Sequence, residues 1–331
     1  MYRERDGQSS FWGDPLYEMI LPKDHFLREL SQVVDFKKVN EMTKNLYSKE
    51  MGRPCHEPAL LFKMIFLQFL YDISDREIEE QVRYNIAYKW FVGLNAEELP
   101  PDHSTLSVFR DRLGVERFQK IFNWIVSEAK AKGFINERLH IIDATDIEAK
   151  VDIVKWNARK KQREDDDQGN ASGSHPDKEA RWGFKRRDKP FFGFKFHGGM
   201  DADSEIFTRC DVTSGNESDI KSFFKVMNGR TKAVCADKGY DAWYIHYLLE
   251  GFRIRDGIYR KMRKNLKVKE RSWIERKFSE CKHQHGLERA RYWGLTKMKI
   301  QGYMTAIVVN VKRMWKLTTA PPVKLGVCSA T

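Results

Sequence analysis

The spacing of apolar residues changes at Gly133, and this change constrains the fold more than any other feature of the 331-residue chain. Before it, apolar side chains recur every three or four residues, as over 118–129, which predicts amphipathic helices. After it, short apolar runs bounded by turn residues predict strands. The sequence therefore predicts an all-α N-terminal domain over residues 1–135, followed by an α/β domain over 136–317 with a mixed sheet flanked by helices.

Several signals locate helices in the first half. The run 58–70 is almost wholly apolar and is expected to be a buried central helix. Ser74 and Glu77 have the spacing of a capping box, Ser104 is expected to cap the next helix, and Gly133 is expected to stop the last one. Short capped helices suit a DNA-reading helix-turn-helix and equally suit a plain bundle, so the pattern leaves both open.

The second half is expected to begin with a strand over 139–143 and a further extended segment over 147–153. The polar stretch 160–188 is expected to be a mobile loop, since it has too few apolar residues to form a core. Beyond it we expect a hairpin of two strands from Phe191 and Ile206, a strand ending at Asp237, and helices over 219–227, 243–250 and 304–315. Trp243 and Tyr244 are expected in the core, and the tail 318–331 is expected to be disordered.

The positive charge is concentrated in one segment. The chain has a net charge of +12, and residues 253–299 hold 16 Lys or Arg against 5 Asp or Glu, an excess of 11. A block of one sign on this scale favours a polyanion partner such as nucleic acid, although a basic solvated face would have the same composition. The 32% of charged residues excludes a membrane protein, and five widely spaced cysteines predict reduced thiols and a cytoplasmic location.

Three carboxylates stand out by their positions. Asp143 and Asp237 each end a short apolar run, and Glu275 lies in a helix-like stretch. An ionised carboxylate at the end of a buried strand is costly unless it is compensated, and a divalent cation compensates it. Three such oxygen donors brought together would form a Mg²⁺ site.

Alternatives exist for each carboxylate. On a helix, Arg271, Glu275 and Lys282 project from one face, which also suits an ordinary surface salt bridge worth about 0.3–0.5 kcal/mol. Asp146 and Glu148 are the local competitors of Asp143. Residues three apart on a strand face opposite sides, so we expect Asp143 and Asp146 not to share one site.

Five segments together resemble the DDE transposases of bacterial insertion sequences, in the branch with a helical N-terminal domain before a ribonuclease-H-like core. Asp143 lies in Ile-Asp-Ala-Thr-Asp-Ile-Glu-Ala, and Asp237 lies in Ala-Asp-Lys-Gly-Tyr-Asp, which is the most specific match. Arg271, Glu275 and Lys282 fit the spacing of the third motif, although Val268 stands where the family has tyrosine. The stretches 101–110 and 285–294 resemble two further recurrent motifs.

The resemblance implies a DNA transposase that acts by metal-dependent phosphoryl transfer. Asp143, Asp237 and Glu275 would be the catalytic residues and would bind two Mg²⁺ ions, for which Mn²⁺ would substitute. The partners implied are double-stranded DNA, as terminal inverted repeats and as target, and further copies of the chain in a homodimer or higher oligomer at the bacterial nucleoid. A nuclease on the same core and an inactive DNA-binding protein are the alternatives. The residues expected to contact DNA phosphates are Arg271, Lys282, Lys238, Arg276, Arg289 and Arg291.

Overall fold

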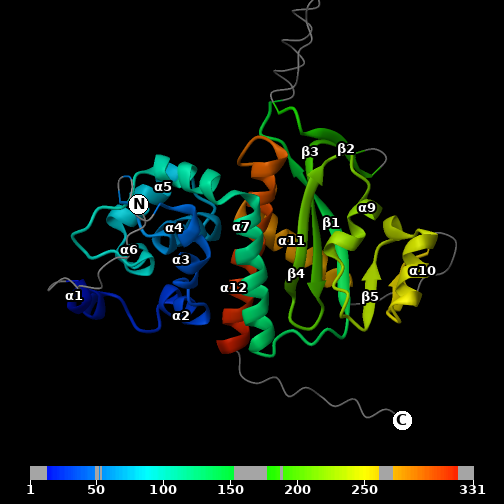
Figure 1. The fold of residues 1–331 in the computed structure, drawn as a ribbon, viewed down its shortest axis with the longest axis horizontal. Helices are drawn as coiled ribbons and strands as arrows, with labels where there is room; N and C mark the ends of the chain where they lie inside the picture. Colours follow the sequence, from blue (N-terminus) through cyan, green and yellow to red (C-terminus); the bar gives the residue numbers. More distant parts are fainter. Residues whose placement is uncertain are drawn as a thin grey trace, which may run out of the picture.

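The computed structural model describes residues 13–48, 52, 54–152, 177–186, 189–260 and 271–319. A helical N-terminal half lies beside a sheet, and helices α7 and α12 run between the two (Figure 1). The helices of the first half are α1 (Gly13–Ile20), α2 (Phe26–Val33), α3 (Lys38–Thr43), the short η1 (Lys44–Leu46), α4 (Pro58–Leu70), α5 (Asp75–Tyr84), α6 (Ile86–Val92) and α7 (His103–Ala131).

Helix α4 is the buried centre of this half, as predicted. All its residues except Lys63 are buried. Its rings Phe62 and Phe66 pack against Phe36, with centroids 6.2 and 5.2 Å apart. Pro58 begins the helix, where its missing N–H group leaves no hydrogen bond unmade.

The helix ends agree with the sequence signals at two of three places. The capping box is confirmed: Ser74 Oγ accepts from the Glu77 N–H, and the Glu77 carboxylate accepts from the Ser74 N–H. Gly133 follows α7 with a φ of +73°, as expected of a helix stop. The expected cap at Ser104 is wrong. Asp102 caps α7 instead, and its carboxylate accepts from the Ser104 N–H at 2.8 Å, because a side chain at the cap position reaches the amide two residues ahead.

The second half forms one six-stranded sheet with the order β2-β3-β1-β5-β6, in which β4 also pairs with β3. Strands β1, β2, β3 and β4 pair antiparallel, whereas β1–β5 and β5–β6 are parallel, so the sheet is mixed as predicted. The strands are β1 (His140–Glu148), β2 (Arg181–Arg186), β3 (Lys189–Asp201), β4 (Ile206–Ser214), β5 (Ala233–Ala236) and β6 (Arg255–Ile258). The helices are α9 (Asp219–Val226), η2 (Lys238–Tyr240), α10 (Trp243–Gly251), α11 (Arg271–His285) and α12 (Leu295–Thr319).

Several expectations for this half need correction. The region 139–148 is one strand rather than two segments, and α12 begins nine residues before the expected 304. The end of the expected loop is the strand β2, because its residues pair with the start of β3 and Trp182 packs against Phe192 at 5.5 Å. Residues 177–180 of that loop are described and include the buried Asp177 and Ala180, whereas 160–176, 187–188 and the tail from 320 lie outside the described residues.

Trp243 is also corrected. It is 78% exposed, because Ile245 and Leu249 are the residues of α10 that face the core. Tyr244 is partly buried against that core, as expected.

Helices cover both faces of the sheet. One face carries Ile141 and Phe196, which belong to the same apolar cluster as residues of α7, α11 and α12. The other face carries Ile142 and Ala236, which pack with residues of α9 and α10. The first cluster also contains α2 and α4, so the helical half and the sheet share one core across α12. None of the helices within the described ranges is long and apolar enough to span a membrane.

Candidate active site

Asp143 and Asp237 lie side by side at the edge of the sheet. Strands β1 and β5 are parallel, and their last paired residues are Ile142 and Ala236. Each is followed directly by an aspartate, and neighbouring strands lie about 4.8 Å apart. Both aspartates are half-buried. The fold thus places two carboxylates from positions 94 residues apart where β5 ends and β1 continues.

Local hydrogen bonds orient these two side chains. Asp143 Oδ1 accepts from the Ala144 N–H at 2.8 Å. Asp237 caps the short helix η2, and its Oδ1 accepts from the Lys238 N–H at 2.7 Å. These backbone donors hold both carboxylates in fixed orientations.

Helix α11 runs alongside β1 in the same direction. Near its start, Arg276 lies 3.8 Å from Glu205. Glu205 is in the turn between β3 and β4, and this turn follows Asp201, which pairs with the first residue of β1. Near its end, Lys282 contacts Asp146 of β1 at 3.0 Å. Glu275 is two turns before Lys282, about 10 Å along the helix. Asp143 is three residues before Asp146, about 10 Å along the strand.

A further contact places part of α11 near Asp143. Gly198 pairs with Asp143 across β1 and β3, and a Cβ added there would lie 3.2 Å from the ring of Phe278. Phe278 is one helical turn after Glu275. Ile274 and Phe278 bury the inner face of α11, whereas Glu275 is exposed.

The three predicted catalytic carboxylates do not form a compact set in the structure. Among the residues that the structure describes, Glu79, Asp102 and His103 are the trio whose ligand atoms all lie within 4.8 Å, and Asp143, Asp237 and Glu275 do not meet that limit together. The trio belongs to the start of α7, where Glu79 accepts from the N–H and ring of His103 at 2.9 and 2.8 Å. We interpret it as part of the helix capping.

Asp146 is separated from the site, as the alternation of a strand requires. It is 6% exposed and forms an ion pair with Lys282. It pairs with Lys195, which lies on the opposite face of the sheet from the Asp143–Gly198 pair. The Lys282 ammonium, expected at a DNA phosphate, thus has a protein carboxylate as its partner.

The other residues expected at DNA lie in different environments. Lys238 and Arg289 are exposed, and Arg276 is exposed next to Glu205. Arg291 connects the two halves: its guanidinium lies 4.7 Å from the Phe69 ring centroid, donates to the Ile73 carbonyl and pairs with Asp72. Arg271 begins α11, and its side chain is outside the described part, as are Val268 and the rest of 261–270. The DNA roles of these residues stay predictions.

A basic cavity of about 570 Å³ follows the site along β1. Its cations lie at the end of α11, in the segment after α11 and just after β1. Lys150, one of these cations, was missed by the sequence reasoning because it lies outside the basic block. The lining residues include Lys150, Lys282, His283, Arg289 and Arg291, with Asp72 and Glu288 among them.

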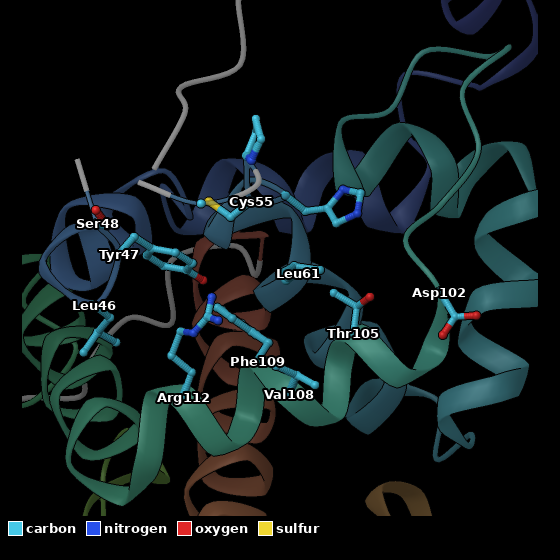
Figure 2. Close-up of a pocket in the computed structure, with 13 residues that line it drawn as sticks. Leu46, Tyr47, Ser48, Cys55, Leu61, Asp102, Thr105, Val108, Phe109 and Arg112 are labelled. Carbon is cyan, nitrogen blue, oxygen red and sulfur yellow. The ribbon is translucent and has the colours of Figure 1, made fainter. Parts of the chain in front are cut away.

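A larger cavity of about 660 Å³ lies within the N-terminal helices (Figure 2). Thr105, Phe109 and Arg112 enter it from α7, and the Arg112 guanidinium lies 4.7 Å from the centroid of the Tyr47 ring. None of the three predicted catalytic carboxylates lines this cavity. It is therefore separate from the candidate active site.

Tyr240 is a further residue of the site that the charge and spacing arguments missed, although it lies in the quoted motif around Asp237. It is 1% exposed and packs with Ile142 and Ala236. Burial, together with the nearby carboxylates of Asp219, Asp143 and Asp237, raises the pKa of its hydroxyl well above the ordinary value. The hydroxyl thus stays protonated beside the two strand-end aspartates.

Comparison with known proteins agrees with this arrangement. A family model described as a transposase DDE domain matches residues 136–311, which is more than half of the chain. Another, described as a transposase domain (DUF772), matches residues 15–112. The sheet and its covering helices are thus a ribonuclease-H-like core, as predicted.

The chain belongs to the DDE transposases, of the type with a helical N-terminal domain found in insertion sequences. It is accordingly a transposase, an enzyme of DNA transposition and recombination that binds DNA and depends on divalent metal. The predicted family and fold are confirmed.

Proposed function

We propose that Asp143, Asp237 and Glu275 are the catalytic residues of this transposase. In this proposal the site cleaves DNA at the ends of the mobile element and then joins the freed 3′-hydroxyl groups to target DNA. The observation that carries the proposal is the parallel pairing of Ile142 with Ala236, which puts two carboxylates side by side at the open edge of the sheet. Glu275 is proposed as the third member because it lies on α11, which contacts β1 through the Lys282–Asp146 pair.

The donor set suits two Mg²⁺ ions, with Mn²⁺ as a substitute. Carboxylate oxygens are ligands that Mg²⁺ prefers. In this proposal the three carboxylates share two ions about 3.5–4 Å apart. When bound, such ions activate an attacking oxygen and stabilise a leaving one.

The chain's own residues supply orientation and charge. The backbone amides of Ala144 and Lys238 hold the aspartates in fixed orientations. The exposed cations Lys238, next to Asp237, and Arg289, after α11, are proposed to neutralise DNA phosphates. Neutralising phosphates gives such an interface most of its affinity and a strong dependence on salt.

We propose that the N-terminal helices bind the terminal repeats and that two or more copies of the chain bring two element ends together. The match of residues 15–112 to a transposase domain supports a DNA-directed role for these helices. A nuclease without strand transfer and an inactive DNA-binding protein are the alternatives.

One assay separates these functions. Purified protein, Mg²⁺ and labelled DNA carrying the terminal inverted repeats should give nicked ends and then joined products. Nicking without joining would favour the nuclease. Binding without nicking would leave only the DNA-binding protein.

Asp237→Asn tests the site itself. It removes one ligand charge but keeps the shape, so we expect cleavage to fall by at least about 10²-fold while DNA binding is retained. Asp111→Asn is the matched control. Asp111 is an exposed aspartate of α7, and it pairs with Lys297 of α12. If Asp237→Asn cleaved at the wild-type rate, Asp237 would not be a metal ligand.

A further inference from the structure

A histidine holds the far end of the turn that follows Asp237. Asp237 and Asp241 cap the two ends of η2, and the Tyr240 N–H donates to the Asp237 carbonyl at 2.9 Å. His246 of α10 lies between Asp241 and Asp256 of β6. Its Nε2 is 2.8 Å from Asp241 Oδ1, and its Nδ1 is 2.7 Å from Asp256 Oδ2. One ring therefore connects the end of η2 to the strand that pairs with β5.

This network is shielded enough from water to matter. The side chains of His246, Asp241 and Asp256 are 12%, 18% and 22% exposed. Fully exposed ion pairs contribute little because solvent and salt screen them, whereas partly buried pairs are screened less. A ring that carries a proton on each nitrogen donates to both carboxylates at once. Arg260 joins the network by donating to Asp256 at 2.8 Å. Helix α10, η2 and β6 are thus held together by charged hydrogen bonds as well as by packing.

The backbone just before Asp237 is attached to the same strand. Strand β5 pairs with β6 over four residues, and beyond that pairing the Tyr259 N–H donates to the Ala236 carbonyl at 3.1 Å. Asp256 thus belongs to the strand that holds the residue before Asp237, while the aspartate at the end of η2 belongs to the turn after it. His246 connects the two, so the backbone is held on both sides of Asp237.

We propose that His246 is a positioning residue of the metal site: by joining Asp241 to Asp256 it fixes the turn that begins at Asp237, and with it the orientation of the Asp237 carboxylate toward a divalent ion. The inference rests on the proposed function, since it assumes that Asp237 is a metal ligand. Loss of residues that orient metal ligands typically weakens metal affinity about 10–100-fold. His246 acts one turn away from the ligand, so we expect the lower end of that range.

Two conservative variants separate the two hydrogen bonds of the ring. The amide nitrogen of asparagine stands close to the position of Nδ1, and that of glutamine stands close to the position of Nε2. His246→Asn thus keeps a donor to Asp256 and loses the donor to Asp241, whereas His246→Gln does the opposite. Each variant loses one contact with a half-buried carboxylate, so a purely structural role predicts similar effects from both.

His103→Gln is the control outside the site. His103 also lies against two carboxylates, with its Nδ1 2.8 Å from Glu79 and 3.6 Å from Asp102, at the start of α7. The three variants are made in the full chain. Mn²⁺ affinity is measured by calorimetry and electron paramagnetic resonance, and thermal unfolding is measured without metal.

We expect His246→Asn to bind Mn²⁺ about 10-fold more weakly than the wild type. His246→Gln and His103→Gln should keep the wild-type affinity, although all three variants should unfold at somewhat lower temperatures. Wild-type Mn²⁺ affinity in His246→Asn would overturn the proposal. Weaker Mn²⁺ binding in His246→Gln would overturn it as well, since that variant keeps the contact with Asp241. Wild-type Mn²⁺ affinity in Asp237→Asn would instead overturn the proposed function.

Discussion

Asp143 and Asp146 lie three residues apart on one strand, and the fold gives them different surroundings. Asp143 is half-buried at the edge where β5 ends, whereas Asp146 is buried and paired with Lys282. Lys282 itself is 13% exposed, so its ion pair is largely shielded from water. A substitution at Lys282 therefore affects stability as well as any contact with DNA.

Lys282→Met should lower the unfolding temperature, because removing one partner of a buried ion pair costs about 3 kcal/mol. The double variant Lys282→Met with Asp146→Asn should recover most of that loss. If Lys282 also contacts phosphate, DNA binding by the double variant should stay weaker, with the salt slope reduced by about one. Unfolding and DNA binding at two salt concentrations measure the two effects.

Lys238→Met is the matched control for this pair of variants. Because Lys238 is exposed, this substitution should weaken DNA binding without changing the unfolding temperature. Wild-type DNA affinity in the double variant would show that Lys282 acts only through Asp146.

At the scale of elements, α7 and α11 position the site. Helix α7 spans both halves of the molecule and bends at Gly114, where φ is 60° and ψ is 174°. Before the bend, Arg110 pairs with Asp75 of α5; after it, Phe122 packs against Tyr303 of α12 at 5.7 Å. The bend thus lets one element pack against the N-terminal helices and against the helix that supports the sheet.

Gly114→Ala should destabilise the protein by about 1–3 kcal/mol, because this backbone conformation is essentially restricted to glycine. A Cβ at Gly114 would have no atom within 4 Å, so the cost comes from the backbone alone. Gly229→Ala is the control: its Cβ also enters open space and its φ is not positive. Urea unfolding of both variants measures the difference. Equal stability would mean that α7 does not need the bend.

For the whole molecule, three buried histidines, in the sheet and at the junction of the two halves, make the stability depend on pH. His140 and His197 lie in the sheet, and each ring accepts or donates one hydrogen bond to a threonine at 2.8 Å. His285 ends α11 and contacts the Phe69 carbonyl of α4 at 3.0 Å. Burial lowers the pKa of each of the three histidines to about 4.

These shifts predict loss of stability in mild acid. An unfolded histidine takes up its proton near pH 6.5, whereas these three do so only near pH 4. The stabilisation is therefore complete above pH 6.5 and is lost as the pH falls toward 4, by about 2 kcal/mol per histidine at pH 5. Thermal unfolding from pH 8 to pH 4.5 measures it.

His283 and His285 form a matched pair for this prediction. His283→Gln should leave the pH profile unchanged because the residue is exposed. His285→Gln should flatten it by about a third. If His285→Gln left the pH dependence of the unfolding temperature unchanged, burial of His285 would not be a cause of that dependence.

Much of the fold follows from local sequence. Pro58–Leu70, the Ser74–Glu77 box and the hairpin of β3 and β4 depend on residues close in the chain, and all three were predicted. The strand β2 was missed because its pairing with β3 outweighs its polar composition. Trp243 was placed wrongly because an apolar side chain does not by itself show which face of α10 meets the sheet.

The sequence by itself determined which carboxylates are candidates, because a charge that ends an apolar strand is a local feature. Only the tertiary structure decided how they are used. The β1–β5 pairing sets Asp143 beside Asp237, α11 packs against β1, and Lys282 pairs with Asp146, 136 residues away in the chain. The position of His246 between two carboxylates is likewise visible only in the fold. Such contacts join distant segments, and packing of the whole core, rather than local preference, fixes them.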